Sequence, residues 1–353
     1  MRDEMPEPIA HWIESETGGR LVAAKRAGEG ASRRAWAVDL VGVRGPEALF
    51  CLCDATPAGG GSLRDAAVLQ ALAPTAIPVP AVRAASAELG AILLERVPGR
   101  SALPPADAEP ERERVARDLM RLSALLHRLD PAALPIAHLG APGAPRSHAL
   151  DQLARLDALL TALGNDALEL QRFAAAALRR SPPTAERTSL VHSDMGPGNF
   201  LYEDGVVTAI LDWEVAHWGD PMEDLAAIAV RDIATPIGPL AVRHAEYAAA
   251  GGPRIDAGAI AWYRVFILAR NTALIALGLR HPLAPADREP LERFQLLLLR
   301  ALALCLDELG GVFDRADRDR IAGFVRERES LARAEAGRLG ELAERRPQRL
   351  VVS

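Results

Sequence analysis

The chain has 353 residues, which is long for a single hydrophobic core and suits two lobes. Hydrophobic residues make up 49% of it and charged residues 25%, as in ordinary globular proteins. The net charge of −6 at pH 7 argues against a general nucleic-acid-binding protein, because such proteins need a basic surface.

The sequence predicts neither a targeting signal nor a membrane span. Its first seven residues are acidic and lack the apolar core of a signal peptide. The stretches 262–279 and 294–307 come closest to a membrane span, and arginines interrupt both. Three cysteines without framework spacing suggest reduced thiols. We therefore expect a cytoplasmic protein with no membrane or nucleic-acid partner.

The N-terminal part of the chain predicts strands around one helix. Apolar residues alternate with smaller ones in 34–54, which predicts two strands joined by a turn near Gly45. Leucines and alanines fall on one side of 62–73 and predict a helix. Prolines make 77–80 an extended connector, and 89–97 returns to strand character before Pro98.

Beyond residue 98 the pattern becomes mainly helical. The predicted helices include 109–129, 147–163, 165–180 and 323–346. A short strand is expected at 206–211. We therefore predict an α+β fold with two lobes, a small β-rich lobe at 1–97 and a larger helical lobe at 98–353.

One stretch, residues 190–214, carries the candidate chemistry. Two short apolar segments flank the turn Glu203-Asp204-Gly205 and should pair as a hairpin. The loop before the first strand holds His192, Asp194 and Asn199, and Asp212 follows the second strand. Since a hairpin brings its two ends together, the two carboxylates and the amide can converge. Such hard oxygen ligands suit Mg²⁺, which takes further ligands from water and phosphates.

This spacing, H-x-D-x-x-x-x-N followed by a further Asp, resembles the aminoglycoside phosphotransferase and choline kinase family of the protein-kinase-like superfamily. The resemblance extends over roughly residues 20–310. Its most specific part runs from His192 through Leu225 and includes Asp212-Trp213-Glu214. It implies a two-lobed kinase-like fold and an ATP-dependent transfer of phosphate to a small-molecule hydroxyl group.

The resemblance also implies roles for single residues. Asp194 would accept the substrate hydroxyl proton or orient that hydroxyl, while Asn199 and Asp212 would hold Mg²⁺. His192 would brace the loop. Independently of the resemblance, Asp220-Pro221-Met222-Glu223 is the pattern of a helix start with Asp220 as N-cap, and we expect the following helix to pack against the metal loop, with Asp224 tying the loop down. The implied nucleotide contacts are Gly30, Ser32, Arg33, Glu95 and Val97.

One position departs from the family pattern. The third strand should carry a Lys or Arg that pairs with an acid of the next helix, but Leu52 or Cys53 occupies that place. The helix acid is Asp65. Three interpretations stay open: another cation replaces the missing one, the enzyme is slow or uses a different donor, or the chain is a pseudokinase that binds nucleotide without turnover. The candidate cations are Arg33, Arg34, Arg64 and Lys25.

Another enzyme class could be inferred from His192 and Asp194 together with His244, the ligand types of a non-haem Fe(II) site. The long helical runs on both sides argue against the β-rich barrel that such a site needs. The acceptor is not determined by the sequence. The mostly apolar helices of 230–310 favour an apolar or acyl-bearing hydroxyl compound over a polycationic aminoglycoside. The oligomeric state and the choice between ATP and GTP stay open.

Overall fold

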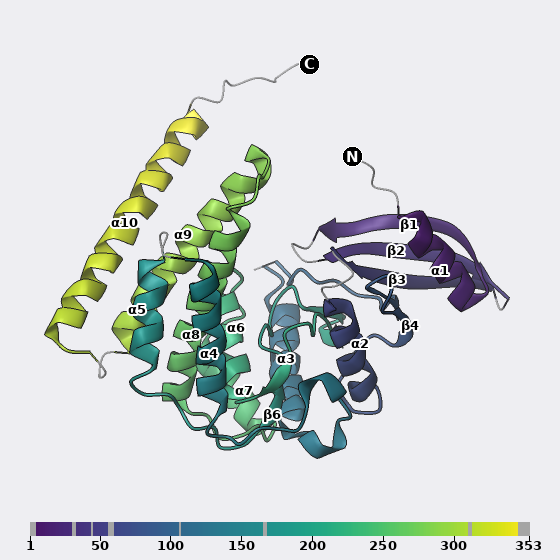
Figure 1. Ribbon diagram of the computed structural model, residues 1–353, viewed down its shortest axis with the longest axis horizontal. Coiled ribbons are helices and arrows are strands. Elements are labelled where there is room, and N and C mark those ends of the chain that lie inside the picture. Colours follow the sequence, from purple (N-terminus) through teal and green to yellow (C-terminus); the bar gives the residue numbers. More distant parts are fainter. Residues whose placement is uncertain are drawn as a thin grey trace. The chain divides into compact units, whose positions relative to one another are not determined.

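The computed structural model describes residues 5–29, 33–43, 45–55, 60–105, 107–164, 168–309 and 313–344. The chain forms two compact units (Figure 1). The first consists of Met1–Pro145 and Glu186–Ile255, and the second of Arg146–Ala185 and Asp256–Ser353. The division into lobes at residue 97 stays a prediction, because these units follow contacts within the chain and not that boundary.

An antiparallel sheet of five strands opens the first unit, in the order β1-β2-β3-β5-β4. Its strands are β1 (Arg20–Glu29), β2 (Arg33–Gly42), β3 (Gly45–Asp54), β4 (Val82–Ser86) and β5 (Ala91–Glu95). Helix α1 (Glu7–Thr17) precedes the sheet, and α2 (Gly61–Leu72) follows β3. The predicted strands in 34–54 and 89–97 and the helix at 62–73 are confirmed, whereas α1, β1 and β4 were not predicted.

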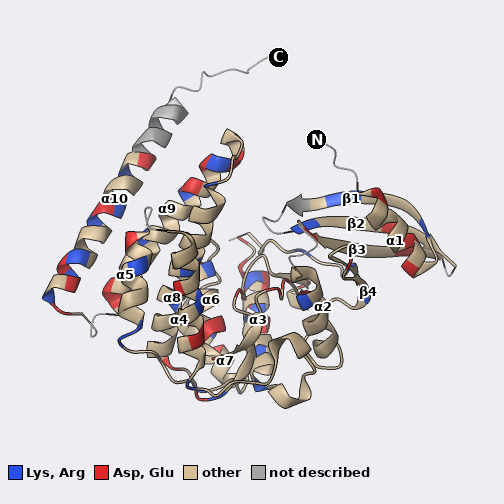
Figure 2. Cartoon of the chain, in the orientation of Figure 1, with Lys and Arg blue, Asp and Glu red and all other residues tan. Residues whose placement is uncertain are grey.

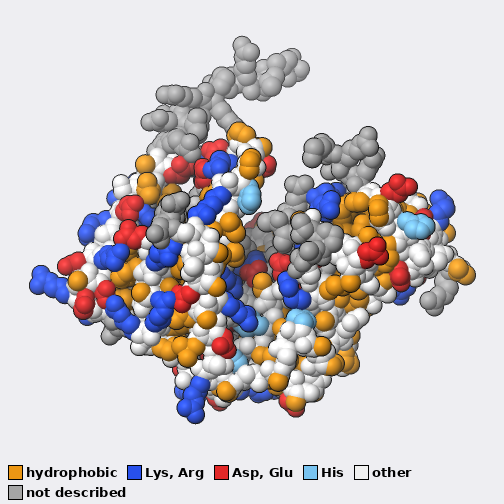
Figure 3. Space-filling view, viewed as in Figure 1, with side chains coloured by type: hydrophobic (Ala, Val, Ile, Leu, Met, Phe, Trp, Pro, Cys, Tyr) orange, Lys and Arg blue, Asp and Glu red, His pale blue; other side chains and the backbone are white. Residues whose placement is uncertain are grey.

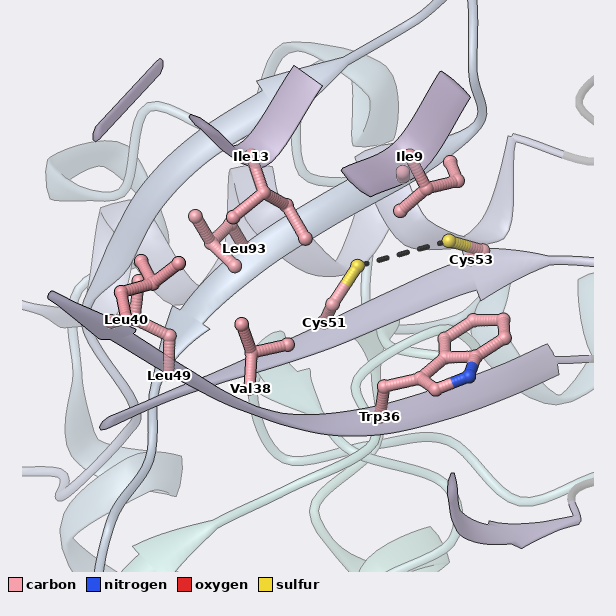
Figure 4. Packing of buried hydrophobic residues seen from close by; sticks show 10 residues of the cluster. Ile9, Ile13, Trp36, Val38, Leu40, Leu49, Cys51, Cys53 and Leu93 are labelled. Carbon is pink, nitrogen blue, oxygen red and sulfur yellow. Dashed lines mark hydrogen bonds between the residues drawn. The ribbon is translucent and has the colours of Figure 1, made fainter. Parts of the chain in front are cut away.

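One face of the sheet forms a hydrophobic core with α1. Ile9 and Ile13, one helical turn apart, point from α1 toward Trp36 and Val38 of β2 (Figure 4). Cys51 and Cys53 of β3 point to the same side, and all three cysteines are free and buried. Because side chains alternate along a strand, Leu52 faces the other side of the sheet.

The remainder of the first unit holds two short two-stranded sheets between helices, one of them a hairpin. Its helices are α3 (Glu109–Arg128), α6 (Met222–Asp232) and α7 (Leu240–Ala249), with short 3₁₀ turns at Pro131–Ala133 and Ala137–Leu139. Strand β6 (Ser189–Val191) pairs with β9 (His217–Gly219), and β7 (Phe200–Glu203) with β8 (Val206–Ile210). The predicted hairpin around Asp204 is therefore confirmed, while β9 was not predicted.

The second unit is helical in its described residues. Its helices are α4 (His148–Ala162), α5 (Glu169–Leu178), α8 (Ala257–Gly278), α9 (Pro285–Glu308) and α10 (Arg315–Glu344). Trp262 and Phe266 of α8 stack on each other inside it, and Trp262 donates a hydrogen bond to the Leu178 carbonyl at 2.9 Å. Acidic and basic residues are interspersed along the coloured part of α10 (Figure 2), as expected for a solvated helix. The sheet followed by helices confirms the α+β prediction.

Helix α8 is long and apolar enough to cross a membrane by its composition, in contrast to the expectation from its arginines. However, 56% of its most apolar window is buried inside the protein, as in the core helix of a globular fold. It is therefore weak evidence for a span. On the face seen in Figure 3, basic, acidic and hydrophobic side chains are interspersed.

Candidate active site

The β7–β8 hairpin brings the two halves of the predicted site together. The Leu211 amide donates to the Asn199 carbonyl at 2.8 Å, which extends the pairing of the hairpin to its open end. The Asn199 side-chain amide donates to both the carbonyl and the carboxylate Oδ2 of Asp194, at 2.9 and 2.8 Å. These bonds use the amide nitrogen and leave the Asn199 Oδ1 as an acceptor. The Asp194 side chain keeps 35% of its surface exposed, so a substrate can reach it.

A buried carboxylate of α6 holds the loop that carries Asp194. Asp224 accepts from the backbone amides of His192 and Ser193 at 3.0 and 2.7 Å, and from His127 Nε2 at 2.9 Å. Burial alone would raise the pKa of Asp224, but the hydrogen bond and charge of His127, together with the neighbouring His192, bring it below its ordinary value. Asp224 is therefore a carboxylate that ties the loop to α6.

Ser193 in the loop has a backbone geometry that is unfavourable for its residue type. Its φ angle is 66°, in the left-handed region that L-residues other than Asn and Asp seldom adopt. The Ser193 hydroxyl donates to Glu223 at 2.6 Å, which anchors this conformation. Asp212, which follows β8, has a φ angle of 64°, which an Asp tolerates more readily. Strained positions that neighbours hold in place often cluster at functional sites.

Both ring nitrogens of His192 contact backbone groups. Its Nε2 donates to the Leu211 carbonyl at 2.8 Å, and the Asp194 amide approaches its Nδ1 at 3.3 Å. The ring also packs against Trp213, with centroids 4.6 Å apart. These contacts connect the two ends of the hairpin. Because both ring nitrogens contact backbone groups, neither is available to transfer a proton to or from a substrate.

A cation lies beside the site even though the third strand has none. Arg33, the first residue of β2, is only 8% exposed and forms an ion pair with Asp65 of α2. Its guanidinium also donates to the Glu214 carboxylate at 3.0 and 2.6 Å, and lies 3.4 Å from Asp212 Oδ1. Burial alone would lower the pKa of Arg33, but these three carboxylates together raise it further above its ordinary value.

The ion pair affects its two partners differently. Burial raises the pKa of Asp65 to about 6, and the charge of Arg33 offsets this rise only in part. The raised pKa of Arg33 indicates a favourable ion pair, whereas the raised pKa of Asp65 does not. Because a guanidinium stays protonated at any ordinary pH, the pair is ionised at pH 7. Partial burial and the neighbouring Glu214 likewise raise the pKa of Asp212, against the effect of Arg33. Three carboxylates, those of Asp65, Asp212 and Glu214, therefore surround the single guanidinium of Arg33.

A pocket of about 590 Å³ opens next to these charges on the sheet face opposite α1. Its walls include Ala35, Phe50, Leu52, Leu69, Leu94, Leu201 and Leu211, together with Arg33, Asp65, Asn199 and Asp212. Glu95 and Val97, predicted to contact the nucleotide, also line it. Of the two residues considered for the third-strand cation position, Leu52 faces this pocket and Cys53 faces the core. Gly30 and Ser32 lie outside the described residues.

Two further residues of this site were not predicted from the sequence. Glu214 was quoted in the motif but given no role, although it lies two residues from Asp212. Arg231 was not considered, yet it contacts Asp194 at both carboxylate oxygens. Its signal was present in the sequence, because it follows Asp224 by seven residues and therefore lies on the same face of α6.

The oxygen donors of the site match the ligands that Mg²⁺ prefers. Among the described residues no group of three or more His, Cys, Asp and Glu side chains is arranged to hold a metal ion. Asn199 and Asp212 supply only an amide oxygen and one carboxylate, so an ion here would complete its shell with water and phosphate oxygens, as Mg²⁺ usually does. Asn199 and Asp212 therefore fit a Mg²⁺ ion that takes its other ligands from water and phosphate.

Comparison with known proteins identifies relatives of this chain. Residues 23–263 match the model of the phosphotransferase enzyme family. No curated protein matches. Among solved structures, the chain is 21% identical to a protein of Ralstonia eutropha JMP134 to which an aminoglycoside phosphotransferase activity is attributed, with a TM-score of 0.63 over 83% of this chain and 95% of that one.

Two further structures have kinase-like folds of the same kind. Macrolide 2′-phosphotransferase MphH of Brachybacterium faecium is 22% identical, with a TM-score of 0.57 over 81% of this chain and 97% of that one. A thermostable mutant of aminoglycoside phosphotransferase APH(4)-Ia, in complex with AMP-PNP and hygromycin B, is 17% identical, with a TM-score of 0.59 over 83% and 97%. At these identities the matches show the fold alone. That fold is not the β-rich barrel that the iron alternative requires.

Proposed function

The chain belongs to the phosphotransferase enzyme family, and we propose that it is an ATP-dependent kinase that phosphorylates a hydroxyl group of a small molecule. The observation that carries this proposal is the convergence of Asp194 and Asn199 with Asp212 beside a pocket that also contains Arg33. AMP-PNP and hygromycin B in the APH(4)-Ia structure support a nucleotide donor and a small-molecule acceptor.

The apolar part of the pocket suits the adenine ring. Phe50, Leu52 and Leu201 provide apolar walls, and the segment from Glu95 to Val97 also lines the pocket. In this family's pattern such a segment offers backbone hydrogen bonds to the base. Arg33 and Asp212, at the charged end of the pocket, then lie where the phosphates would be.

Arg33 takes the part of the missing third-strand cation. It forms the ion pair with the helix acid Asp65 that the family builds from the third strand. A guanidinium can also contact phosphate oxygens with two donors at once. Its partner Glu214 is 28% exposed and can be exchanged for a phosphate without the burial of a free charge.

In the transfer step, the acceptor hydroxyl oxygen attacks the γ-phosphorus and the bond from that phosphorus to the β-bridging oxygen breaks. The hydroxyl proton passes to Asp194, and ADP leaves with the bridging oxygen. A Mg²⁺ ion held by Asn199 and Asp212 would offset the charge that develops on the phosphate oxygens. His192 and Asp224 hold the loop so that Asp194 keeps its place.

The test is ATP consumption over a panel of alcohols, sugars, aminoglycosides, macrolides and hydroxyacyl thioesters. Asp194→Asn should lower kcat by about 10²–10⁴-fold and leave ATP binding intact, because a positioned base contributes about that much. Undiminished turnover in Asp194→Asn would refute the assigned role.

The pseudokinase alternative rests on Leu52, which removes the usual cation from the pocket wall. It predicts an ATP-dependent rise in thermal stability with no ADP formation for any acceptor in the panel. If neither binding nor turnover is detected at millimolar ATP and Mg²⁺, both functions are excluded.

A further inference from the structure

The carboxylate of Asp194 is held by a second residue of α6. The Arg231 Nε donates to Asp194 Oδ1 at 3.0 Å, and its Nη2 donates to Oδ2 at 2.5 Å. Its remaining nitrogen, Nη1, donates to the Pro197 carbonyl at 2.7 Å. The guanidinium thus grips the carboxylate with two parallel bonds and anchors the middle of the same loop.

The loop is shaped around this arginine. Gly196 and Gly198 have φ angles of 138° and 97°, which side chains other than glycine rarely allow. A Cβ atom on Gly196 would lie 2.8 Å from Cδ of Arg231, and one on Gly198 would lie 3.4 Å from its Nη1. The glycines therefore serve the close approach of the loop backbone to the Arg231 side chain, as well as the sharp turn.

The bonds to Asp194 are distributed unequally over its two oxygens. Among the residues that the structure describes, Oδ2 accepts from both Arg231 and Asn199, whereas Oδ1 accepts from Arg231 alone. A carboxylate oxygen offers about two acceptor positions, so Oδ1 retains one and Oδ2 is filled. The acceptor hydroxyl must therefore approach Oδ1.

From these contacts we propose that Arg231 is a positioning residue for catalysis, which fixes the Asp194 carboxylate with Oδ1 toward the acceptor hydroxyl. The inference rests on the proposed kinase activity. A rotation of the carboxylate by a small angle moves Oδ1 away from the line of transfer, and a misplacement of about 1 Å can cost about 10²-fold in rate. Arg231 does not line the nucleotide pocket, so ATP binding does not depend on it.

The kinetic test compares Arg231→Ala, Arg231→Lys and the control Arg121→Ala. Arg121 is an arginine of α3 that donates to Asp118 and is 50% exposed. Arg231→Ala should lower kcat by roughly 10²-fold with KM for ATP unchanged. The kcat of Arg231→Lys should lie between those of Arg231→Ala and the wild type, since an ammonium cannot make the two parallel bonds. Free guanidinium ion at millimolar concentration should restore part of the activity of Arg231→Ala and none to Asp194→Asn.

A stability measurement tests the contact without turnover. In a double-mutant cycle of Arg231→Gln and Asp194→Asn, the Tm shifts should be clearly less than additive, because either change already breaks the same bonds. Additive shifts, an unchanged kcat in Arg231→Ala, or a parallel loss of ATP binding would each overturn the proposal. If wild-type protein turns over no acceptor although the cycle shows coupling, the proposed function fails and the catalytic role of Arg231 fails with it.

Discussion

Replacement of Arg33 by Met should weaken ATP binding in a protein that still folds. At pH 7 the stability that is lost when Asp65 loses its cation is limited, because Asp65 can take up a proton instead. With a pKa of about 6, protonation of this carboxyl at pH 7 costs about 1.4 kcal/mol. The charge-assisted bonds to Glu214 add about 1.5–3 kcal/mol. We expect a total loss of about 3–4 kcal/mol in the free energy of unfolding. ATP affinity should fall about 10–100-fold if a contact of similar strength to phosphate is lost.

The assay combines urea unfolding with calorimetric titration of ATP and Mg²⁺. Arg34→Met is the matched control, because Arg34 is the exposed next residue of β2 and lies over the Trp36 ring. Adding Leu52→Lys to Arg33→Met should recover part of the ATP affinity, since Leu52 faces the same pocket. A folded Arg33→Met protein that binds ATP as tightly as the wild type would refute the assignment of Arg33 to the phosphates.

Three further outcomes follow from the same geometry. Asp224→Asn should destabilise the protein by about 2–4 kcal/mol in urea unfolding, since an amide cannot accept from both loop amides and from His127; a change below about 0.5 kcal/mol would contradict the tie. Burial raises the pKa of Asp65, so the folded state binds more protons than the unfolded state between about pH 4 and 6. Wild-type stability relative to Asp65→Asn should therefore fall by about 3 kcal/mol as the pH rises through that window and be level above it, and a rise would be inconsistent with a raised pKa. Asp212→Asn should require at least about tenfold more Mg²⁺ for half-maximal activity, and an unaltered Mg²⁺ titration would argue against Asp212 as a ligand.

Local patterns in the sequence were sufficient to predict the hairpin and the loop that carry the candidate catalytic residues. The turn at Asp204 determines the β7–β8 register, which in turn brings Asn199 beside Leu211. Asp224 was predicted to tie the loop because the helix that follows Asp220 has a clear start signal, and Asp220 Oδ1 indeed accepts from the Met222 amide at 3.0 Å. These features depend on residues close together in the chain.

The sequence did not single out Arg33 among the basic residues that we considered as replacements for the missing cation. Four basic residues were candidates, and the choice depends on the β2–β3 register, which pairs Arg33 with Asp54. The pair with Asp65 then joins residues 32 positions apart, and the one with Glu214 joins residues 181 positions apart. Helix α1 was missed because only Ile9 and Ile13 of it are buried, too few for a visible period.

The cation that lines the pocket beside Asp65 is a guanidinium, that of Arg33, and not an amine. Lys25 is the only lysine of the whole chain, and it is not among the residues that line the pocket. An electrophilic nucleotide analogue that acylates amines would meet no lysine among the residues that line the pocket, and a guanidinium is a far poorer nucleophile because it stays protonated. If the protein binds ATP as we propose, a chemical survey of ATP-binding proteins with such reagents would overlook it. A reagent directed at the buried arginine, or photochemical capture by the nucleotide base, would be needed to detect it.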